Sequence, residues 1–364
     1  MKIEQLTIEN FKCFKTEKTF DFGRITILTG ANSSGKSSIV NGILMILQSE
    51  GFPKSLSTNG SFVNLGDFED IANSHDATKI ISLGLKIRSK ERIDHFTSKW
   101  IIDKTNFLPN LYEQKANVIA DTPKSRGNGR PMSTFNFGLK NINFLGAFRK
   151  QPQRTNLEQN KAEFKIEKDG EGYLDQIVEW EKRGNGKIKQ LIKVMKGLEL
   201  IEDVKTKRLS GGRFEILVKP VSSKNATSLS NVGYGVSQFL PIIVSDLQLP
   251  DDSTLFLAEP EIHLHPSVQS KFGDYIVNQV NKTQKNYVIE THSEYFLNKI
   301  RLAIVKGELK KEDIKIYFLE NKDDDTEVFD IDFKKNGAIK NAPKTFFETY
   351  SIDVMDIALN AFAE

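Results

Sequence analysis

Residues 24–37 read RITILTGANSSGKS, an apolar run that leads directly into a glycine-rich turn. The turn holds the complete pattern G-x-x-x-x-G-K-[ST], from Gly30 to Ser37. Residues 36–48 then read KSSIVNGILMILQ and carry apolar side chains at helical spacing. A strand, a glycine-rich turn and a helix in this order form the setting in which the pattern marks a phosphate-binding loop. We therefore predict a nucleotide site here.

The residue types of the loop suit phosphate binding. Gly30 and Gly35 permit a tight backbone whose successive N–H groups turn toward phosphate oxygens. Lys36 is expected to reach the β- and γ-phosphates, and the hydroxyl of Ser37 to ligate Mg²⁺. The helix that begins here adds the positive end of its dipole. The predicted nucleotide-binding residues are Gly30, Asn32, Ser33, Ser34, Gly35, Lys36, Ser37 and Ser38.

Strand-like and helix-like segments alternate in the second half of the chain. The apolar runs STLFLAEP (253–260) and NYVIETHS (286–293) are each followed by a helical pattern. This alternation predicts an α/β fold with a mostly parallel central sheet. The polar middle is interpreted as an inserted α+β region, and antiparallel strands are expected beside the parallel ones. The predicted parts are a first lobe at 1–50, the inserted region at 51–225, a second lobe at 226–320, and C-terminal strands with a closing helix at 321–364.

The composition is that of an ordinary globular protein, with 364 residues, 38% hydrophobic and 27% charged. Its net charge of +3 is too close to neutral to indicate a nucleic-acid partner by itself. Cys13 is the single cysteine, which excludes an intrachain disulfide and favours a reducing compartment. The first residues lack the apolar core of a signal peptide, and no apolar run approaches the roughly 20 residues that span a bilayer. We therefore expect a soluble, cytoplasmic protein without a membrane partner.

Four motifs along the chain carry a resemblance to a known group. They are GANSSGKSS (30–38), VGYGVSQFLPI (232–242), EPEIHLHP (259–266) and ETHSEYFLNKIR (290–301). In this order they resemble ABC-type ATPases of the OLD-like and SMC-like branch. More closely, they resemble bacterial AAA family ATPases that stand alone or beside an effector gene, often in phage-defence loci. The opening residues 3–14 and the late residues 337–350 are similar to the same group.

Two stretches compete for the motif that would cover the nucleotide of a neighbouring subunit. LSGGR (209–213) looks like an ABC signature but runs into an alternating strand pattern, so we interpret it as a hairpin turn. The stretch at 231–241 leads instead into a credible helix. The resemblance implies that Gly235, Ser237 and Gln238 contact the γ-phosphate held by the opposite protomer. It thus implies a homodimer with ATP sandwiched between the protomers, and it leaves a higher oligomer open.

The resemblance also implies the chemistry. Glu259 matches the general base that orients the attacking water, and His292 matches the switch histidine that senses the γ-phosphate. Together with Lys36 they form the predicted catalytic set, with ATP and Mg²⁺ as cofactors. Ala258 is a departure, because relatives carry at this position an Asp that helps to hold Mg²⁺. Since Ser37 can remain the main protein ligand of the ion, we expect slow hydrolysis rather than none.

Other polar residues keep two interpretations. Arg149 and Arg154 follow a predicted strand and suit phosphate contacts, but a surface loop with ordinary salt bridges explains them equally well. His263 and His265 are two residues apart with no nearby cysteine, which is a poor zinc pattern. Residues 182–197 hold six basic residues and no acidic one. They form either a nucleic-acid-binding helix or a core-packed helix with a solvated face.

The predicted function is an ATPase that dimerises on ATP and regulates a separate effector, such as a nuclease or toxin, in antiphage defence. About 70 residues follow His292, too few for the TOPRIM nuclease domain of OLD proteins, so no intrinsic nuclease is expected. The middle region is too short for SMC coiled-coil arms and lacks sustained heptads. Two alternatives stay open: a catalytically inactive nucleotide-dependent scaffold, for which Ala258 argues, and a DNA-repair or SMC-like DNA-associated ATPase.

Overall fold

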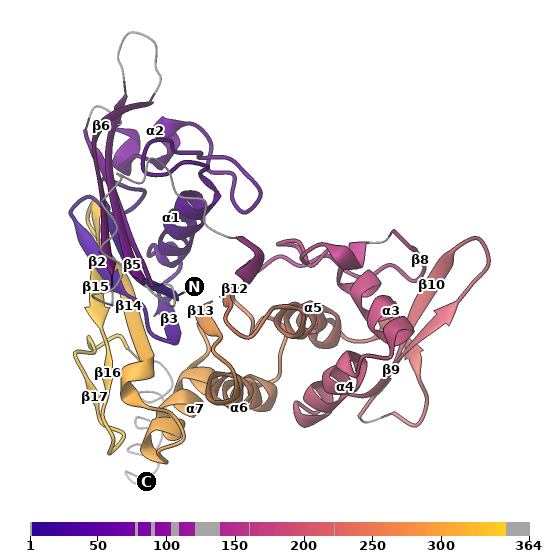
Figure 1. Ribbon diagram of the computed structural model, residues 1–364. Helices are drawn as coiled ribbons and strands as arrows, with labels where there is room; N and C mark the ends of the chain where they lie inside the picture. Colours follow the sequence, from indigo (N-terminus) through magenta and orange to yellow (C-terminus); the bar gives the residue numbers. More distant parts are fainter. Residues whose placement is uncertain are drawn as a thin grey trace.

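A sheet of six strands forms the centre of the fold within the residues that the computed structural model describes, which are 2–76, 79–88, 92–102, 109–120, 139–159, 161–221 and 223–346. The strands are β3 (Ile25–Gly30), β7 (Ile142–Leu145), β12 (Thr254–Ala258), β13 (Asn286–Glu290), β14 (Ile314–Lys322) and β15 (Asp325–Asp330). Their order is β15-β14-β3-β13-β12-β7 (Figure 1). All neighbours run parallel except β15, which is antiparallel to β14. The predicted α/β fold with a mostly parallel sheet is confirmed.

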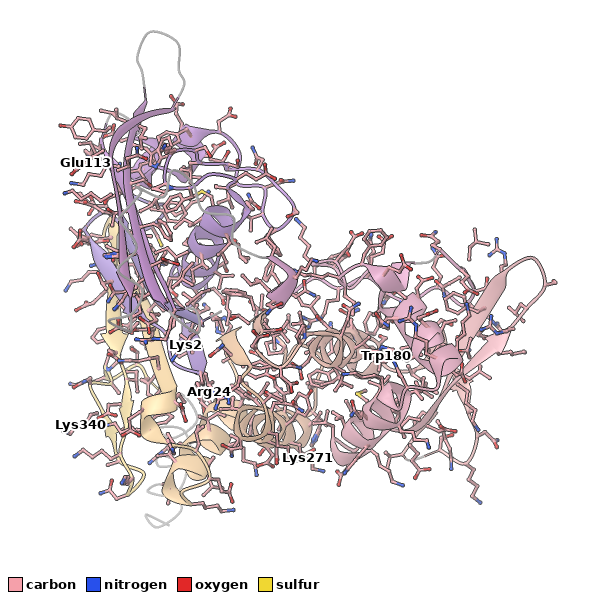
Figure 2. All side chains as sticks on the ribbon, viewed as in Figure 1. Lys2, Arg24, Glu113, Trp180, Lys271 and Lys340 are labelled. Atoms are coloured by element: carbon pink, nitrogen blue, oxygen red, sulfur yellow. The ribbon has the colours of Figure 1, made fainter. Side chains whose placement is uncertain are left out.

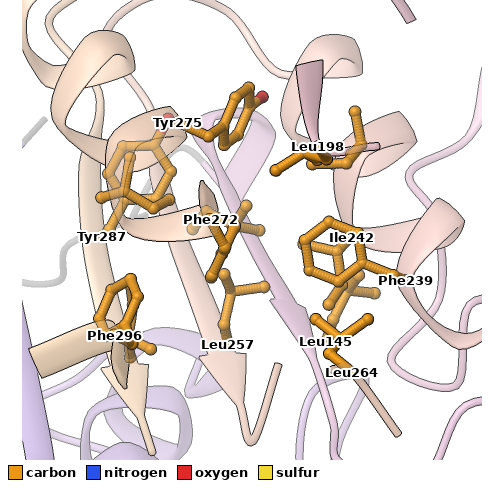
Figure 3. Packing of buried hydrophobic residues seen from close by; sticks show 14 of the residues in the cluster. Leu145, Leu198, Phe239, Ile242, Leu257, Leu264, Phe272, Tyr275, Tyr287 and Phe296 are labelled. Carbon is orange, nitrogen blue, oxygen red and sulfur yellow. The ribbon is translucent and has the colours of Figure 1, made fainter. Parts of the chain in front are cut away.

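The central strands are buried on both faces, as their continuous apolar runs indicate. Successive side chains of a strand point to opposite faces. Accordingly, Ile25 of β3 joins one hydrophobic core while Leu28 joins the other. Figure 3 shows the first core, in which Phe272 packs edge-on against Phe239 and stacks with Phe296. The sheet is therefore a buried platform that holds the ends of its strands in fixed positions.

An antiparallel sheet and the first helix enclose the second core. The elements are β1 (Lys2–Glu9), β2 (Lys18–Asp21), α1 (Lys36–Gln48), α2 (Phe68–Ile71), β4 (Ile81–Arg88), β5 (Arg92–Ile102) and β6 (Pro109–Ala120). The strand order is β2-β1-β4-β5-β6. Within the region at 51–225, β4 to β6 extend the sheet of β1, and β7 joins the central sheet through its pairing with β12. The proposed division of the chain into parts stays a prediction.

A helical arm extends away from the two sheets (Figure 1). It comprises β8 (Asn156–Leu157), α3 (Tyr173–Arg183), α4 (Lys187–Gly197), β9 (Ile201–Arg208), β10 (Arg213–Pro220), β11 (Thr227–Ser228) and α5 (Tyr234–Gln248). Trp180, labelled in Figure 2, is buried in this arm. Two further helices, α6 (Pro266–Lys282) and α7 (Glu294–Val305), pack in the same hydrophobic core. The arm is therefore continuous with the core of the central sheet.

The LSGGR stretch lies in the turn between β9 and β10, which pair antiparallel. Gly211 and Gly212 in this turn have φ angles of 70° and 68°. Glycine adopts this left-handed region without the steric cost that other residues meet. The prediction of a hairpin turn is confirmed.

The basic segment forms α4, whose Leu191 and Met195 are buried in the core. Lys189 and Lys193 are exposed, whereas the Nζ of Lys187 donates to the carbonyl of Leu247 at 2.8 Å. The helix is therefore core-packed with a solvated basic face. Nucleic-acid binding by that face stays a prediction.

The C-terminal part adds strands, as predicted. After β14 and β15 come β16 (Asp332–Phe333) and β17 (Ile339–Lys340), which pair antiparallel. The closing helix expected toward the C-terminus lies beyond residue 346 and so outside the described residues. In the described part of the chain, none of the helices combines the length and apolar character that crossing a bilayer requires.

Asp246 of α5 is the centre of a buried polar network. Its carboxylate pairs with Lys285 at 3.2 Å, and the two side chains are 1% and 4% exposed. Tyr287 of β13 donates to the same carboxylate at 2.9 Å, and Tyr275 of α6 donates to its other oxygen. A buried ion pair costs desolvation, which these extra hydrogen bonds offset. The network therefore ties the helical arm to the central sheet.

We expect Asp246→Ala to lower the free energy of unfolding by about 3–5 kcal/mol, because it leaves the ammonium of Lys285 buried without a counter-ion. Urea unfolding followed by circular dichroism measures this loss. The control is Asp203→Ala, which removes an exposed pair with Lys205 and should change stability by less than about 1 kcal/mol. Equal losses of unfolding free energy in the two variants would contradict a stabilising role of the buried Asp246 network.

Candidate functional site

The loop after β3 has a conformation that only glycine fits at two positions. Gly30 has a φ of 130°, and a Cβ there would lie 2.1 Å from the carbonyl oxygen of Leu319. Gly35 has a φ of 101°, and a Cβ there would lie 2.4 Å from the Sγ of Cys13. Both the backbone angle and the lack of space therefore exclude a larger residue. This explains in physical terms why the pattern places glycine at 30 and 35.

Lys36, the first residue of α1, is buried within the loop. Its Nζ donates to the carbonyl oxygens of Gly30 at 3.1 Å and Ala31 at 2.6 Å. Desolvation lowers the pKa of Lys36, although the charges of Glu290, Glu259 and Glu261 act in the opposite direction. The ammonium group thus lies among the carbonyls of the loop and close to three carboxylates.

Ser37 has a carboxylate partner that the sequence analysis missed. Its hydroxyl donates to Oε1 of Glu290 at 2.7 Å. Glu290 ends β13, is 5% exposed, and has its pKa raised by burial. In the parallel pairing of β12 and β13, Glu290 lies directly beside Ala258. The signal in the sequence was the Glu that ends the apolar run NYVIE, immediately before the histidine motif.

The backbone of Glu259 is held from both sides. Its N–H donates to the carbonyl of Glu290 at 2.8 Å, and its own carbonyl accepts from Nη2 of Arg149 at 3.3 Å. Arg149 Nη1 also donates to the carbonyl of Ala258 at 3.3 Å. Glu259 has a φ of 44°, in the left-handed region. Such strain persists only where surrounding contacts determine the conformation, and it is frequent at active sites.

The two candidate arginines have different environments. Arg149 is 2% exposed, and burial lowers its pKa to about 10, against the opposing effect of Glu261 and Glu259. Arg149 is therefore not a surface-loop residue, and its guanidinium binds backbone carbonyls. Its predicted phosphate contact stays a prediction. Arg154 is exposed and pairs with Glu215 of β10 at 3.6 Å. That contact places Arg154 beside β10 of the helical arm, and its predicted phosphate contact stays a prediction.

His292 lies two residues after Glu290, the last residue of β13. Its backbone N–H donates to Oε1 of Glu261 at 2.6 Å, which connects the two motifs EPE and ETHS. Desolvation and the nearby charge of Lys36 lower the pKa of His292, while Glu259 acts in the opposite direction. Glu261 itself is half-buried, and desolvation raises its pKa. The imidazole thus lies at the same edge of the sheet as the loop and the carboxylates.

The predicted signature residues lie at the start of α5, but not all of them face outward. Ser237 is buried, and its hydroxyl donates to the carbonyl of Tyr234 at 3.2 Å. Gln238 is also buried, and its Nε2 donates to the carbonyl of Arg149 at 2.9 Å. Gln238 therefore points into its own protomer, because this buried carbonyl needs a donor. Gly235 is partly exposed.

Three exposed residues that are not among the predicted signature residues lie at the start of this helix. Asn231 and Gly233 precede α5, and Tyr234 is its first residue. Tyr234 also lines a hollow of about 850 Å³. The helix has no acidic residue in its first turn. A helix start of this kind favours anions through its free N–H groups and dipole. In the sequence, the signal for this exposed helix start was the polar Asn231 and the glycine at 233, shortly before an apolar helical pattern.

The two histidines of EPEIHLHP have structural contacts. Nδ1 of His265 accepts from the N–H of Ser267 at 3.3 Å and so caps the N-terminus of α6. The ring of His263 lies 5.3 Å from the ring of Tyr234. These contacts explain both residues without a metal.

The donor set around the loop suits a nucleoside triphosphate with a divalent cation. The loop offers backbone N–H groups and an ammonium group for phosphate oxygens, and a serine hydroxyl next to a carboxylate for a hard cation. Glu290 ends β13, and Glu259 directly follows the last residue of the adjacent parallel strand β12. The predicted loop residues, Glu259 and His292 therefore lie together, whereas Arg154 does not.

Comparison with known proteins agrees with this geometry. A family model described as AAA ATPase domain matches residues 1–206 and 147–297. A search of curated proteins returned no match. Among solved structures, an Smc head bound to the C-winged helix domain of ScpA is similar, with a TM-score of 0.57, 14% identity, and coverage of 92% of this chain and 99% of that chain.

A second similar structure is an Smc head domain with an extended coiled coil, bound to the C-terminal domain of ScpA derived from Pyrococcus furiosus. It has a TM-score of 0.52 and 14% identity, and covers 91% of this chain and 96% of that chain. At such low identity the likeness concerns the fold alone, which is that of an SMC-type ATPase head. Because the family model covers most of its length, the protein belongs to the AAA ATPase domain family.

Proposed function

We propose that this protein binds ATP with Mg²⁺, hydrolyses it slowly, dimerises on ATP and regulates a separate effector. The observation that carries the proposal is the position of Lys36 and Ser37 beside two carboxylates, those of Glu259, which directly follows β12, and of Glu290, which ends β13. The proposed place in antiphage defence rests on the resemblance of the four motifs to ATPases of the OLD-like branch, which are often encoded in phage-defence loci.

Each residue of the proposed site has a distinct task. The loop N–H groups and Lys36 bind the phosphates, and Ser37 is the protein ligand of the cation. Bound Mg²⁺ would neutralise charge on the β- and γ-phosphate oxygens. Glu259 orients the attacking water, which needs a carboxylate at a fixed position. The proposed task of His292 is to contact the γ-phosphate, and the hydrogen bond from its N–H to Glu261 supports this role because it fixes the backbone at His292.

The proposed dimer places the start of α5 against the nucleotide of the partner. Asn231, Gly233 and Gly235 supply that contact, whereas Gln238 holds Arg149 in its own protomer. An exposed helix start without acidic residues supports this arrangement, because the γ-phosphate is an anion. Each composite site then needs both protomers. The Smc heads of similar fold are bound to domains of ScpA. We propose a separate effector, such as a nuclease or toxin, as the corresponding partner here.

The two alternatives make different demands on the molecule. An inactive scaffold would bind ATP and dimerise without turnover, for which the absence of a carboxylate at Ala258 argues. A DNA-associated ATPase would use the exposed lysines of α4. We favour the slow ATPase because Glu259, His292 and Lys36 are all retained and lie together.

We expect Lys36→Ala to abolish ATP binding, because it removes the ammonium group from the loop. Glu259→Gln should keep ATP binding but lower turnover by about a hundredfold or more, since a positioned general base contributes at least that much. The glutamine variant should accumulate as an ATP-bound dimer. Phosphate release and light scattering measure the two effects.

The matched control for this experiment is Glu179→Gln on α3, which changes a partly exposed carboxylate paired with Arg183. It should behave like the wild type. Dimerisation of the wild type without turnover would favour the scaffold. Normal turnover in Glu259→Gln would contradict the proposed base.

We expect charge reversal at Lys189 and Lys193 to leave ATP binding and ATP-dependent dimerisation unchanged, because both side chains lie on the solvated face of α4. Binding of the wild type to duplex DNA is measured in parallel at several salt concentrations. Salt-dependent DNA binding that the double variant loses would favour the DNA-associated alternative. Loss of dimerisation in the variant would contradict the proposed dimer, in which the start of α5, and not α4, contacts the partner protomer.

A further inference from the structure

We infer that Glu290 supplies the magnesium-supporting carboxylate that position 258 lacks. The inference rests on the proposed function, since it concerns the divalent cation of the same site. In relatives, the carboxylate that supports the cation is at the position of Ala258. Here we assign that task to Glu290, the first residue of the motif ETHSEYFLNKIR. The ligand class is a hard divalent cation bound together with nucleotide phosphates.

The strand order explains how a carboxylate at position 290 can replace one at position 258. β13 lies between β3, which leads into the loop, and β12, which ends in Ala258. Ala258 and Glu290 are direct partners in the pairing of β12 with β13. A carboxylate at 290 is therefore displaced from position 258 by one strand, about 4.8 Å, toward the strand of the loop. It reaches the hydroxyl of Ser37 at 2.7 Å.

The backbone at Glu290 is held by both neighbouring strands. Its carbonyl accepts from the N–H of Glu259 at 2.8 Å, and the N–H of Thr291 donates to the carbonyl of Leu28 at 3.0 Å. The side chain is 5% exposed. A carboxylate fixed in this way has little freedom to leave Ser37, so the contact is a built part of the site.

The direction of the hydrogen bond suits cation binding. Ser37 donates its proton to Glu290, which leaves the lone pairs of the serine oxygen for a cation. A carboxylate that accepts a hydrogen bond from a ligand orients that ligand and makes its oxygen more basic. Replacing a residue that hydrogen-bonds to a metal ligand typically lowers the metal affinity 10- to 100-fold.

An alanine at position 258 is compatible with cation binding if Glu290 is the supporting carboxylate. Adjacent residues in parallel strands lie about 4.8 Å apart, so an Asp at 258 would place a second negative charge beside Glu290. Like charges at that distance repel each other. The small side chain avoids this repulsion, and the site keeps one supporting carboxylate.

The test measures cation affinity without turnover. Mn²⁺ binding to the protein with a non-hydrolysable ATP analogue is followed by electron paramagnetic resonance, and affinity for the analogue alone is measured in EDTA. Glu290→Gln should weaken Mn²⁺ binding about 10- to 100-fold, with an unchanged affinity for the analogue in EDTA. The swap Ala258→Asp with Glu290→Ala should recover most of the Mn²⁺ affinity that Glu290→Ala alone loses. Glu179→Gln should match the wild type.

Three outcomes would overturn the inference. Unchanged Mn²⁺ affinity in Glu290→Gln would remove Glu290 from the cation site while leaving the proposed ATPase intact. Weaker binding of the analogue in EDTA would make Glu290 a support of the loop rather than of the cation. A wild type that binds no ATP analogue would remove the proposed function itself, together with this inference.

Discussion

The parallel alignment of β3, β13 and β12 is the constraint on which the site depends. Carboxyl ends of parallel strands meet at one edge of a sheet, which is where ligands bind in open α/β folds. Here the edge brings together Gly30, Glu290 and Glu259, which are distant in sequence. Backbone hydrogen bonds continue past the strand ends, from Glu259 to Glu290 and from Thr291 to Leu28. The functional groups are therefore positioned by main-chain pairing and not by flexible loops.

Arg149 connects this edge to the helical arm. Its guanidinium binds the carbonyls of Ala258 and Glu259, while its own carbonyl accepts from Gln238 of α5. A continuous set of hydrogen bonds thus joins the helix start that faces outward with the backbone of the candidate general base. The strained φ of Glu259 lies at the point where these bonds converge. A buried arginine suits this task because its planar group offers several donors in fixed directions.

Much of the site was predictable because the signals are local. The loop pattern, the apolar runs that end in Glu259 and the histidine motif each lie within about ten residues, and the α/β fold follows from their alternation. Arg149 and Arg154 could not be separated in this way. They are five positions apart in similar sequence surroundings, yet one is buried beside Glu259 and the other is exposed beside Glu215. Burial depends on which strands and helices surround a residue, and local pattern does not contain that information.

The sequence by itself determined the phosphate-binding loop, the parallel sheet and the hairpin at LSGGR, since each follows from backbone preferences and apolar periodicity over short stretches. Only the tertiary structure decided the partner of Ser37, which is Glu290, 253 positions away. It also decided that β4 to β6 complete the sheet of β1 and that Gln238 turns inward. These features depend on strand order and on contacts between distant segments. Such contacts form only when hydrogen bonding and packing are satisfied across the whole fold. A local sequence pattern therefore does not predict them.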